Sequence, residues 1–161
     1  MIRSRIEHPI PPFFTENSRV LILGSFPSVK TRESGFFYGH PQNRFWKVIA
    51  AVFDEAVPMT VPEKKALLTR NRIALWDVIQ SCDIIGSSDA SIQNVIANDL
   101  SDILGKAPIE QIIVNGRTAE RFYQKYTENR IHRAAICLPS TSPANAAWKL
   151  EDLIAEWKVI R

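Results

Sequence analysis

The stretch Arg19-Val20-Leu21-Ile22-Leu23-Gly24 decides the fold class of this chain. It is a continuous apolar run that ends on a glycine, and such runs are typical of a strand buried on both faces of a parallel sheet. Three more runs of strand length follow, at residues 73–79, 111–116 and 134–138. Together the four runs predict a mainly parallel sheet with four strands.

Helical patterns separate and follow these runs. Phe45, Ile49, Val52 and Phe53 recur at the spacing of an amphipathic helix. We predict helices at residues 43–53, at a short segment from residue 62, and at residues 89–105, 119–126 and 142–157. The alternation of strands and helices predicts an α/β fold, a three-layer α/β/α sandwich with a central four-stranded, mainly parallel sheet. We expect residues 1–161 to form one domain.

The composition narrows the possible classes of protein. Hydrophobic residues make up 45% of the chain and charged residues 23%, as in ordinary globular domains. No apolar run has the length of a membrane span, and the N-terminus lacks the apolar core of a signal peptide, so we expect a cytoplasmic protein without a membrane partner. Cys82, Cys137 and three scattered histidines lack metal-ligand spacing, so we expect no metal and no cofactor. The net charge of +3 mildly favours an anionic partner such as nucleic acid.

Polar and glycine-containing segments follow each predicted strand. In α/β folds of this kind, ligands bind outside the carboxyl ends of the strands. We therefore expect four segments to converge there, namely residues 24–43, the end of the second strand near Ser81, Asn115-Gly116, and residues 139–145.

The segment after the first strand carries the most specific motif. It reads Gly24-Ser25-Phe26-Pro27-Ser28 and continues as Gly35-Phe36-Phe37-Tyr38-Gly39-His40-Pro41-Gln42-Asn43-Arg44-Phe45-Trp46. From about Pro11 to the C-terminus the chain resembles the uracil-DNA glycosylase superfamily. Its mismatch-specific uracil/thymine enzymes carry a Gly-x-Asn-Pro-Gly turn and a His-Pro-x-Asn-Arg-Phe-Trp segment, whereas this version is similar to the hypoxanthine-DNA glycosylase (DNA-deoxyinosine glycosylase) branch. The resemblance implies a monofunctional enzyme of base excision repair that flips a deaminated base, hypoxanthine, out of DNA and hydrolyses its N-glycosidic bond.

One position departs from the mismatch-specific pattern. Those enzymes place a water-activating asparagine where this chain has Phe26, and a phenyl ring can neither polarise water nor accept a proton. The resemblance to the hypoxanthine branch implies that Asn43 supplies the catalytic group instead. An amide can orient a water molecule toward the oxocarbenium-like sugar that glycoside hydrolysis produces. Because Asn43 also begins a predicted helix, it can equally be an N-cap.

The base pocket is expected to combine an aromatic ring with amide and backbone groups. Tyr38 aligns with the aromatic residue that stacks on the flipped base in related enzymes. Asn115 offers an amide donor and acceptor to the edge of a base, which is the role that the resemblance implies, and the alternative is a structural Asn-Gly turn. We predict that the base-binding residues are Tyr38, Phe26, Asn115, Gly24 and Ser25.

The segment after the fourth strand matches the second motif of the superfamily. Ser142-Pro143 reads as an N-cap followed by proline in the first helical turn, where free N–H groups favour a phosphate. Ser140 stands where uracil enzymes often have histidine, and Ala144 stands where a bulky leucine is a wedge into the base stack. We predict DNA contacts from Ser140, Thr141, Ser142, Pro143, Ala144 and Asn145, and from Lys30, Arg32 and His40 in the first loop.

Two alternatives to this function stay open. One is a uracil-directed glycosylase of the same superfamily. The other is a DNA- or nucleobase-binding module that kept the fold and lost the chemistry with Phe26. We expect a monomer whose partner is DNA containing a deaminated base, and no lyase activity, because no lysine occupies a recognisable Schiff-base position.

Overall fold

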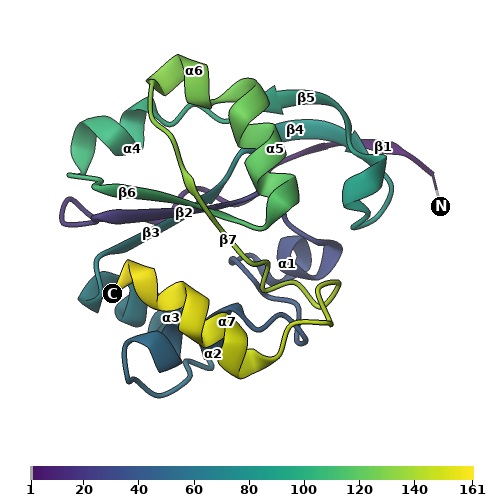
Figure 1. The fold of residues 1–161 in the computed structure, drawn as a ribbon. Coiled ribbons are helices and arrows are strands. Elements are labelled where there is room, and N and C mark those ends of the chain that lie inside the picture. Colours follow the sequence, from purple (N-terminus) through teal and green to yellow (C-terminus); the bar gives the residue numbers. More distant parts are fainter. Residues whose placement is uncertain (1) are drawn as a thin grey trace.

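The computed structural model describes residues 2–161, and its centre is a sheet of four parallel strands (Figure 1). The strands are β2 (Val20–Gly24), β3 (Ile73–Asp77), β6 (Gln111–Asn115) and β7 (Ile136–Leu138), in the order β3-β2-β6-β7. Each neighbouring pair is parallel. The predicted sheet is therefore confirmed, although β7 begins two residues later than expected.

The position of β2 in the sheet explains why its sequence is apolar without alternating polar residues. All five residues of β2 are buried, and successive side chains enter different cores. Val20 and Ile22 join one hydrophobic cluster, while Leu21 and Leu23 join the other. Successive side chains of a strand point to opposite faces, so a strand covered on both faces needs apolar residues at every position.

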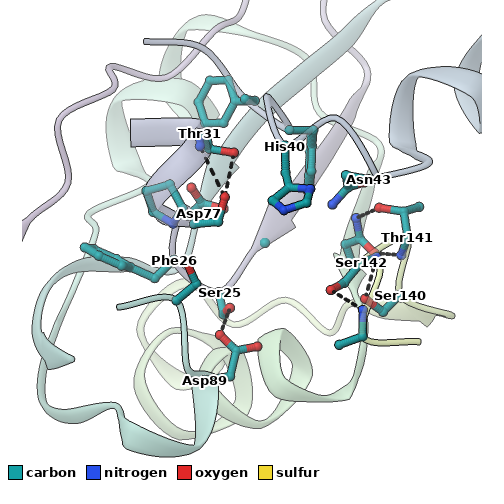
Figure 2. A pocket seen from close by; sticks show the side chains of 18 of the residues that line it. Ser25, Phe26, Thr31, His40, Asn43, Asp77, Asp89, Ser140, Thr141 and Ser142 are labelled. Carbon is teal, nitrogen blue, oxygen red and sulfur yellow. Dashed lines mark hydrogen bonds between the residues drawn. The ribbon is translucent and has the colours of Figure 1, made fainter. Parts of the chain in front are cut away.

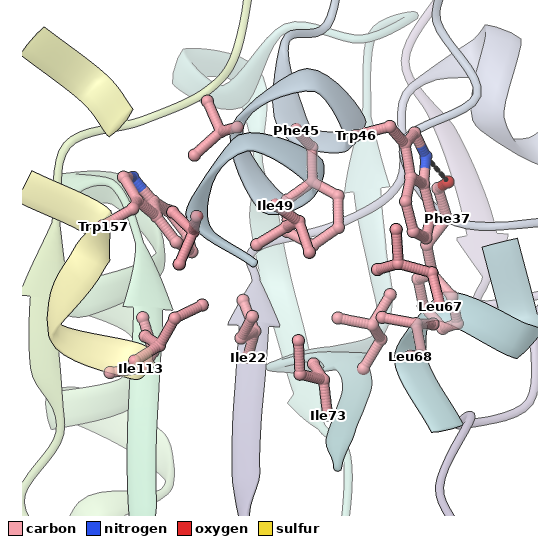
Figure 3. Packing of buried hydrophobic residues seen from close by; sticks show 14 of the residues in the cluster. Ile22, Phe37, Phe45, Trp46, Ile49, Leu67, Leu68, Ile73, Ile113 and Trp157 are labelled. Carbon is pink, nitrogen blue, oxygen red and sulfur yellow. Dashed lines mark hydrogen bonds between the residues drawn. The ribbon is translucent and has the colours of Figure 1, made fainter. Parts of the chain in front are cut away.

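Helices cover both faces of this sheet. One face packs against α2 (Phe45–Val52), α3 (Val61–Arg70) and α7 (Leu150–Trp157), as Figures 1 and 3 show. The opposite face packs against α4 (Ser101–Lys106) and α5 (Arg117–Tyr126), followed by the short α6 (Glu128–Ile131). The three-layer α/β/α sandwich is thus confirmed. The chain ends in the 3₁₀ turn η2 (Lys158–Ile160), and no helix of residues 2–161 is both long and apolar enough to cross a membrane.

Packing of α2 onto the sheet gives a direct test of this core. Ile49 is fully buried and lies between α2, α7 and the strands in Figure 3, whereas Lys47 is exposed on the same helix. We expect Ile49→Ala to lower the free energy of unfolding by about 2–5 kcal/mol, because it removes apolar contacts and leaves a cavity. Lys47→Ala should change it by less than about 0.5 kcal/mol. Urea unfolding of both variants measures the difference, and equal effects would contradict the packing of α2.

A second, antiparallel sheet was not expected from the sequence. It has the order β1-β4-β5 and consists of β1 (Ser4–Glu7), β4 (Ile79–Ile84) and β5 (Gln93–Ala97). The predicted strand 73–79 therefore ends at Asp77, and the chain passes into the second sheet. Ser81, expected near the ligand site, instead pairs with Glu7 inside that sheet.

The predicted helix over residues 89–105 is wrong. The segment forms the 3₁₀ turn η1 (Asp89–Ser91), then β5, and only then the helix α4. Its spacing of Ile92, Val95 and Ile96 suits a helix, but pairing of β5 with β4 satisfies the backbone in the extended form. Buried Asn98 holds the segment after β5 against the junction between β3 and β4, since its Nδ2 donates to the carbonyls of Asp77 (2.9 Å) and Ile79 (3.2 Å).

Two loops beside the site also differ from expectation. The loop after β2 contains the helix α1 (Val29–Ser34), whose first turn is capped by the Ser28 side chain and which ends on Gly35 in a left-handed conformation (φ 78°). The final helix does not begin at Ser142, because α7 starts at Leu150. Residues 139–149 form a loop that leads from β7 to α7 (Figure 1).

Candidate active site

A cavity of about 320 Å³ lies outside the carboxyl ends of the parallel strands (Figure 2). Its wall includes the last residues of β2, β3 and β6 and the loop after β7, which is where ligands bind in open α/β sheets. The lining residues are Gly24–Ser28, Thr31, Phe37, Tyr38, His40, Asn43, Asp77, Ser87, Asp89, Asn115 and Ser140–Ala144. Three of the four segments expected from the sequence therefore meet here, and Asp77 takes the place of the segment near Ser81.

Gly24 leaves open the space at one end of the cavity. A Cβ atom at this position would collide with Oδ1 of Asp77 and would lie 3.3 Å from the Tyr38 hydroxyl. Both oxygen atoms therefore border the volume that only a glycine leaves free. The predicted role of Gly24 in base binding stays a prediction, and the close approach gives it a physical reason.

Tyr38 is held tightly beside this space. Its backbone has φ 53°, and its ring stacks on Phe45 with centroids 4.0 Å apart, so at most one ring face remains for a base. The hydroxyl is buried and has no hydrogen-bond partner among the described residues. Burial, together with the charge of Asp77, raises the pKa of Tyr38 well above its usual range, so the phenol keeps its proton at neutral pH.

Asp77 forms a buried pair with His8. Nε2 of His8 lies 2.6 Å from Oδ2 of Asp77, and the two side chains are 1% and 7% exposed. Nδ1 of the same ring accepts the backbone N–H of Ile10 at 3.2 Å, so the neutral ring carries its proton on Nε2 and donates it to Asp77. No described residue donates to the other carboxylate oxygen, Oδ1.

Phe26, which we predicted to bind the base, is mainly a core residue. It is 8% exposed, its ring lies edge-on to His8 with centroids 5.9 Å apart, and the Arg32 guanidinium lies 5.6 Å from its centroid. In Figure 2 the Phe26 ring points away from the centre of the cavity. Phe26 thus borders the pocket and shields the His8–Asp77 pair from water.

Asn43 combines a backbone contact with a place on the cavity wall. Its Oδ1 accepts the backbone N–H of Phe45 at 3.0 Å, which identifies the oxygen and leaves Nδ2 free to donate. The N-cap alternative is wrong, because α2 begins at Phe45 with Arg44 as its N-cap, and the Asn43 contact is a turn bond just before the helix. The contact uses one lone pair of Oδ1, so the second lone pair and both N–H groups stay available to a ligand or water.

His40 lies between Asp77 and Asn43 in the view of Figure 2. Its Nδ1 accepts the backbone N–H of Gln42 at 3.1 Å, so the neutral ring carries its proton on Nε2. A ring fixed in this tautomer is a hydrogen-bond donor for an anionic group. This geometry suits the phosphate or leaving-group contact expected from the sequence.

Asn115 joins β6 to the loop after β7. Its Nδ2 donates to Oγ1 of Thr141 at 3.0 Å, and its Oδ1 accepts the backbone N–H of Thr141 at 3.1 Å. Arg44, just before α2, holds the same loop by donating to the carbonyls of Asn145 and Trp148. The amide of Asn115 is therefore occupied largely by Thr141, which is fully buried.

The loop at residues 139–149 is not the helix N-terminus that we expected as a phosphate site. Side-chain hydroxyls organise it instead, because Ser140 Oγ accepts the N–H of Ser142 at 3.1 Å and Ser142 Oγ accepts the N–H of Ala144 at 3.2 Å. Such local side-chain bonds compete with helix formation, which explains the late start of α7. Ser140, Thr141, Ser142, Pro143 and Ala144 still line the cavity, and Asn145 braces the loop by donating to the Ser140 carbonyl.

We expect Asn115→Ala to lower base excision about 10-fold without changing which base is preferred. The reason is that the variant removes two hydrogen bonds that hold Thr141, each contributing about 1 kcal/mol. Thr141→Ala removes only one of them and should have a smaller effect, and the double variant should be less than additive. Excision rates on several bases measure this. A changed base preference in Asn115→Ala would support direct base reading, as the sequence suggested.

The first-loop cations lie outside the cavity wall. Arg32 is half-buried and donates to the carbonyls of Pro27 (3.1 Å) and Gly86 (3.3 Å), so it mainly connects α1 to the segment after β4. Lys30 is exposed on α1. Ser25 borders the cavity, and its hydroxyl donates to Asp89 at 3.4 Å. The phosphate contacts expected from Lys30 and Arg32 stay predictions.

Sequence reasoning missed His8, Asp77 and Asp89. Asp77 directly follows an apolar run, which is a usable signal, but the strand was extended past it to residue 79. Nothing in the sequence marks His8, because only the pairing of β1 with β4 brings the N-terminal segment beside β3. Among residues 2–161 the structure shows no cluster of three or more histidine, cysteine or acidic residues able to hold a metal ion.

Known proteins share this architecture and sequence. A model of the uracil DNA glycosylase superfamily matches residues 11–160. A hypoxanthine DNA glycosylase of Methanosarcina acetivorans is 32% identical over 96% of this chain and 98% of its own length, and one of Methanosarcina barkeri is 31% identical over 70% of this chain and 72% of its own length. A solution NMR structure from Methanosarcina acetivorans, described as a uracil DNA glycosylase, has a TM-score of 0.79 and 30% identity, covering 96% of this chain and 98% of that one. The chain therefore belongs to the uracil DNA glycosylase superfamily.

Proposed function

We propose that this protein is a monofunctional DNA glycosylase that excises hypoxanthine from deoxyinosine by base flipping and hydrolysis of the N-glycosidic bond. The observation that carries the proposal is the Asn43 amide on the wall of the cavity, in a site where Phe26 is packed into the core. A polar group able to orient water is therefore present although the usual position lacks one. The relatives named hypoxanthine DNA glycosylases support the choice of base.

The cavity suits a flipped nucleobase. Its volume of about 320 Å³ is at the small end of ligand pockets, and an enzyme that acts on a base has to take that base out of the stack. Tyr38 has one ring face covered by Phe45, and we assign the opposite face to stacking on the base. A mismatched base such as hypoxanthine opposite thymine costs less to unpair.

Hydrolysis needs a water molecule positioned to attack the anomeric carbon of the sugar and a group that stabilises the departing base. The second lone pair of Asn43 Oδ1 accepts a hydrogen bond from the water and directs the water oxygen toward the anomeric carbon. His40, protonated on Nε2, donates to the negative charge that leaves with the purine or to the adjacent phosphate. The transition state resembles an oxocarbenium ion, so positioning and electrostatics do most of the chemistry.

The DNA backbone is assigned to the loop beside the cavity. Hydroxyl and backbone groups of Ser140 and Ser142 line the cavity beside the fully buried Thr141, and Lys30 is an exposed cation on α1. Contacts of this kind position a duplex without reading its sequence. Ala144 is exposed on the loop, but its side chain is small and fills the space of an extruded base poorly.

An abasic-site assay tests the proposal. Duplexes that carry one deoxyinosine, deoxyuridine or deoxyxanthosine are incubated with the protein and then cleaved with alkali. We expect strand cleavage with the inosine duplex, only after the alkali step because the enzyme has no lyase activity. Cleavage of the uracil duplex alone would instead support a uracil-directed enzyme, and base-dependent binding without any abasic product would support a binding module.

A further inference from the structure

The buried pair of His8 and Asp77 has no part in the hydrolysis described above, yet it borders the cavity. We infer that His8 holds Asp77 so that its free oxygen, Oδ1, accepts the ring N–H that deamination creates on a base, which makes Asp77 a specificity-determining residue and His8 its positioning residue. The inference rests on the proposed function, because it deepens the account of the base that the site accepts.

The geometry leaves one carboxylate oxygen for a ligand. Oδ2 of Asp77 is occupied by Nε2–H of His8 at 2.6 Å, whereas Oδ1 faces the open volume above Gly24 and receives no hydrogen bond from a described residue. The buried and unpartnered hydroxyl of Tyr38 borders the same volume. Asp77 lines the cavity, and its Oδ1 has no donor among residues 2–161, so this oxygen is available to accept a hydrogen bond from a bound ligand.

His8 is held rigidly enough to fix the carboxylate. The backbone N–H of Ile10 occupies Nδ1, and the rings of Phe26, Phe37 and Trp76 enclose the imidazole at centroid distances of 5.9, 6.3 and 6.3 Å. The enclosed ring can neither turn nor exchange its tautomer without losing a hydrogen bond. His8 comes from the N-terminal segment, ahead of residue 11, where the match to the superfamily model begins.

The chemistry of deamination explains why an acceptor belongs here. Adenine and cytosine present a ring nitrogen with a lone pair on the Watson–Crick edge, and deamination replaces it with an N–H beside a new carbonyl. A carboxylate oxygen repels the lone pair and accepts the N–H, so it separates the damaged base from its parent. A flipped base is read on this edge. In Figure 2 Asp77 and Asn43 lie on opposite sides of the cavity, which allows one to contact the base edge and the other the sugar.

A substrate methylated at N1 of hypoxanthine tests the contact directly. Duplexes carry 2′-fluoro-deoxyinosine or its N1-methyl form, and both resist hydrolysis because fluorine destabilises the positively charged sugar. The opposite strand carries an abasic analogue at this position, so that base pairing does not contribute to binding. We expect N1-methylation to weaken binding to the wild type at least about 10-fold, since a hydrogen bond to a charged group is lost. In Asp77→Ala the methyl penalty should disappear. An equal penalty in both proteins would overturn the inference.

Asp77→Asn keeps the shape of the side chain, so it tests the contact even if the alanine variant fails to fold. Because Nε2–H of His8 still requires an acceptor, the asparagine has to turn its oxygen to His8 and its NH₂ group to the cavity. A donor then replaces the acceptor. We expect binding of the 2′-fluoro-deoxyinosine duplex to fall at least about 10-fold while binding of the 2′-fluoro-deoxyadenosine duplex stays the same or improves. An equal loss for both bases would contradict the assignment.

Two further variants complete the experiment. His8→Ala should reduce the preference for hypoxanthine over adenine, and His8→Gln, which retains a donor, should restore part of it. The matched control is Asp102→Asn, which removes an exposed carboxylate paired with Lys106 on α4 and should leave both bindings unchanged. Wild type that discriminates the duplexes but yields no abasic site from deoxyinosine would contradict the proposed hydrolysis and still support the role of Asp77. Wild type that does not discriminate hypoxanthine from adenine would contradict the role of Asp77.

Discussion

Asn43→Ala is expected to lower single-turnover excision of hypoxanthine by about 100- to 1000-fold, the usual cost of removing one preorganised polar group from an active site. Binding of a non-cleavable inosine duplex should change little, because the residue faces the reacting water more than the base. The measurement is the rate of abasic-site formation with enzyme in excess. Wild-type excision by this variant would remove Asn43 from the mechanism.

Asn43 also has a structural contact, so its two roles have to be separated. Its Oδ1 accepts the N–H of Phe45 at the start of α2, and loss of such a contact costs about 1 kcal/mol of stability. Asn43→Ser keeps a side-chain oxygen for this N–H, but that oxygen is one bond closer to the backbone than Oδ1 and therefore does not reach the water that Asn43 orients. We expect the serine variant to be nearly as stable as wild type in urea and as inactive as the alanine variant. If the serine variant were active, the role of Asn43 would be confined to the helix start.

Gly24→Ala is expected to lower excision at least about 100-fold through the shape of the cavity alone. The added Cβ collides with Oδ1 of Asp77 and approaches the Tyr38 hydroxyl, so the carboxylate has to leave its bond to His8. Small displacements of groups that position a substrate are known to cost this much. Unlike Asn43→Ala, this variant should also bind the non-cleavable inosine duplex more weakly. Binding and single-turnover excision, measured together, distinguish the two cases.

Gly105→Ala is the matched control for this substitution. Gly105 lies in α4, and a Cβ there meets no atom within 4 Å. We expect unchanged excision and a stability gain of about 0.5–1 kcal/mol, because alanine favours helix over glycine. If both alanine variants retained full activity, the close packing of Gly24, Asp77 and Tyr38 around a bound base would be wrong.

The sequence by itself determined the parallel sheet and the cavity at its edge. A strand buried on both faces has no polar side of its own, so the run at residues 19–24 could hardly be read otherwise. Asn43 and Tyr38 could be named because the segment after β2 resembles a motif of the uracil-DNA glycosylase superfamily, and residues 140–144 because they resemble its second motif. These features depend on local sequence patterns, which involve only residues close together in the chain.

The tertiary structure decided what the neighbours of those residues are. The spacing of Ile92, Val95 and Ile96 fits a helix as well as a strand, and only the pairing of β5 with β4 selects the strand. The hydroxyl bonds within residues 140–144 delay α7, although the sequence reads as a helix start. His8 and Asp77 are 69 positions apart, and their hydrogen bond depends on β1 crossing to β4. Long-range contacts of this kind follow from how whole helices and strands pack, so they cannot be predicted from any single segment of the sequence.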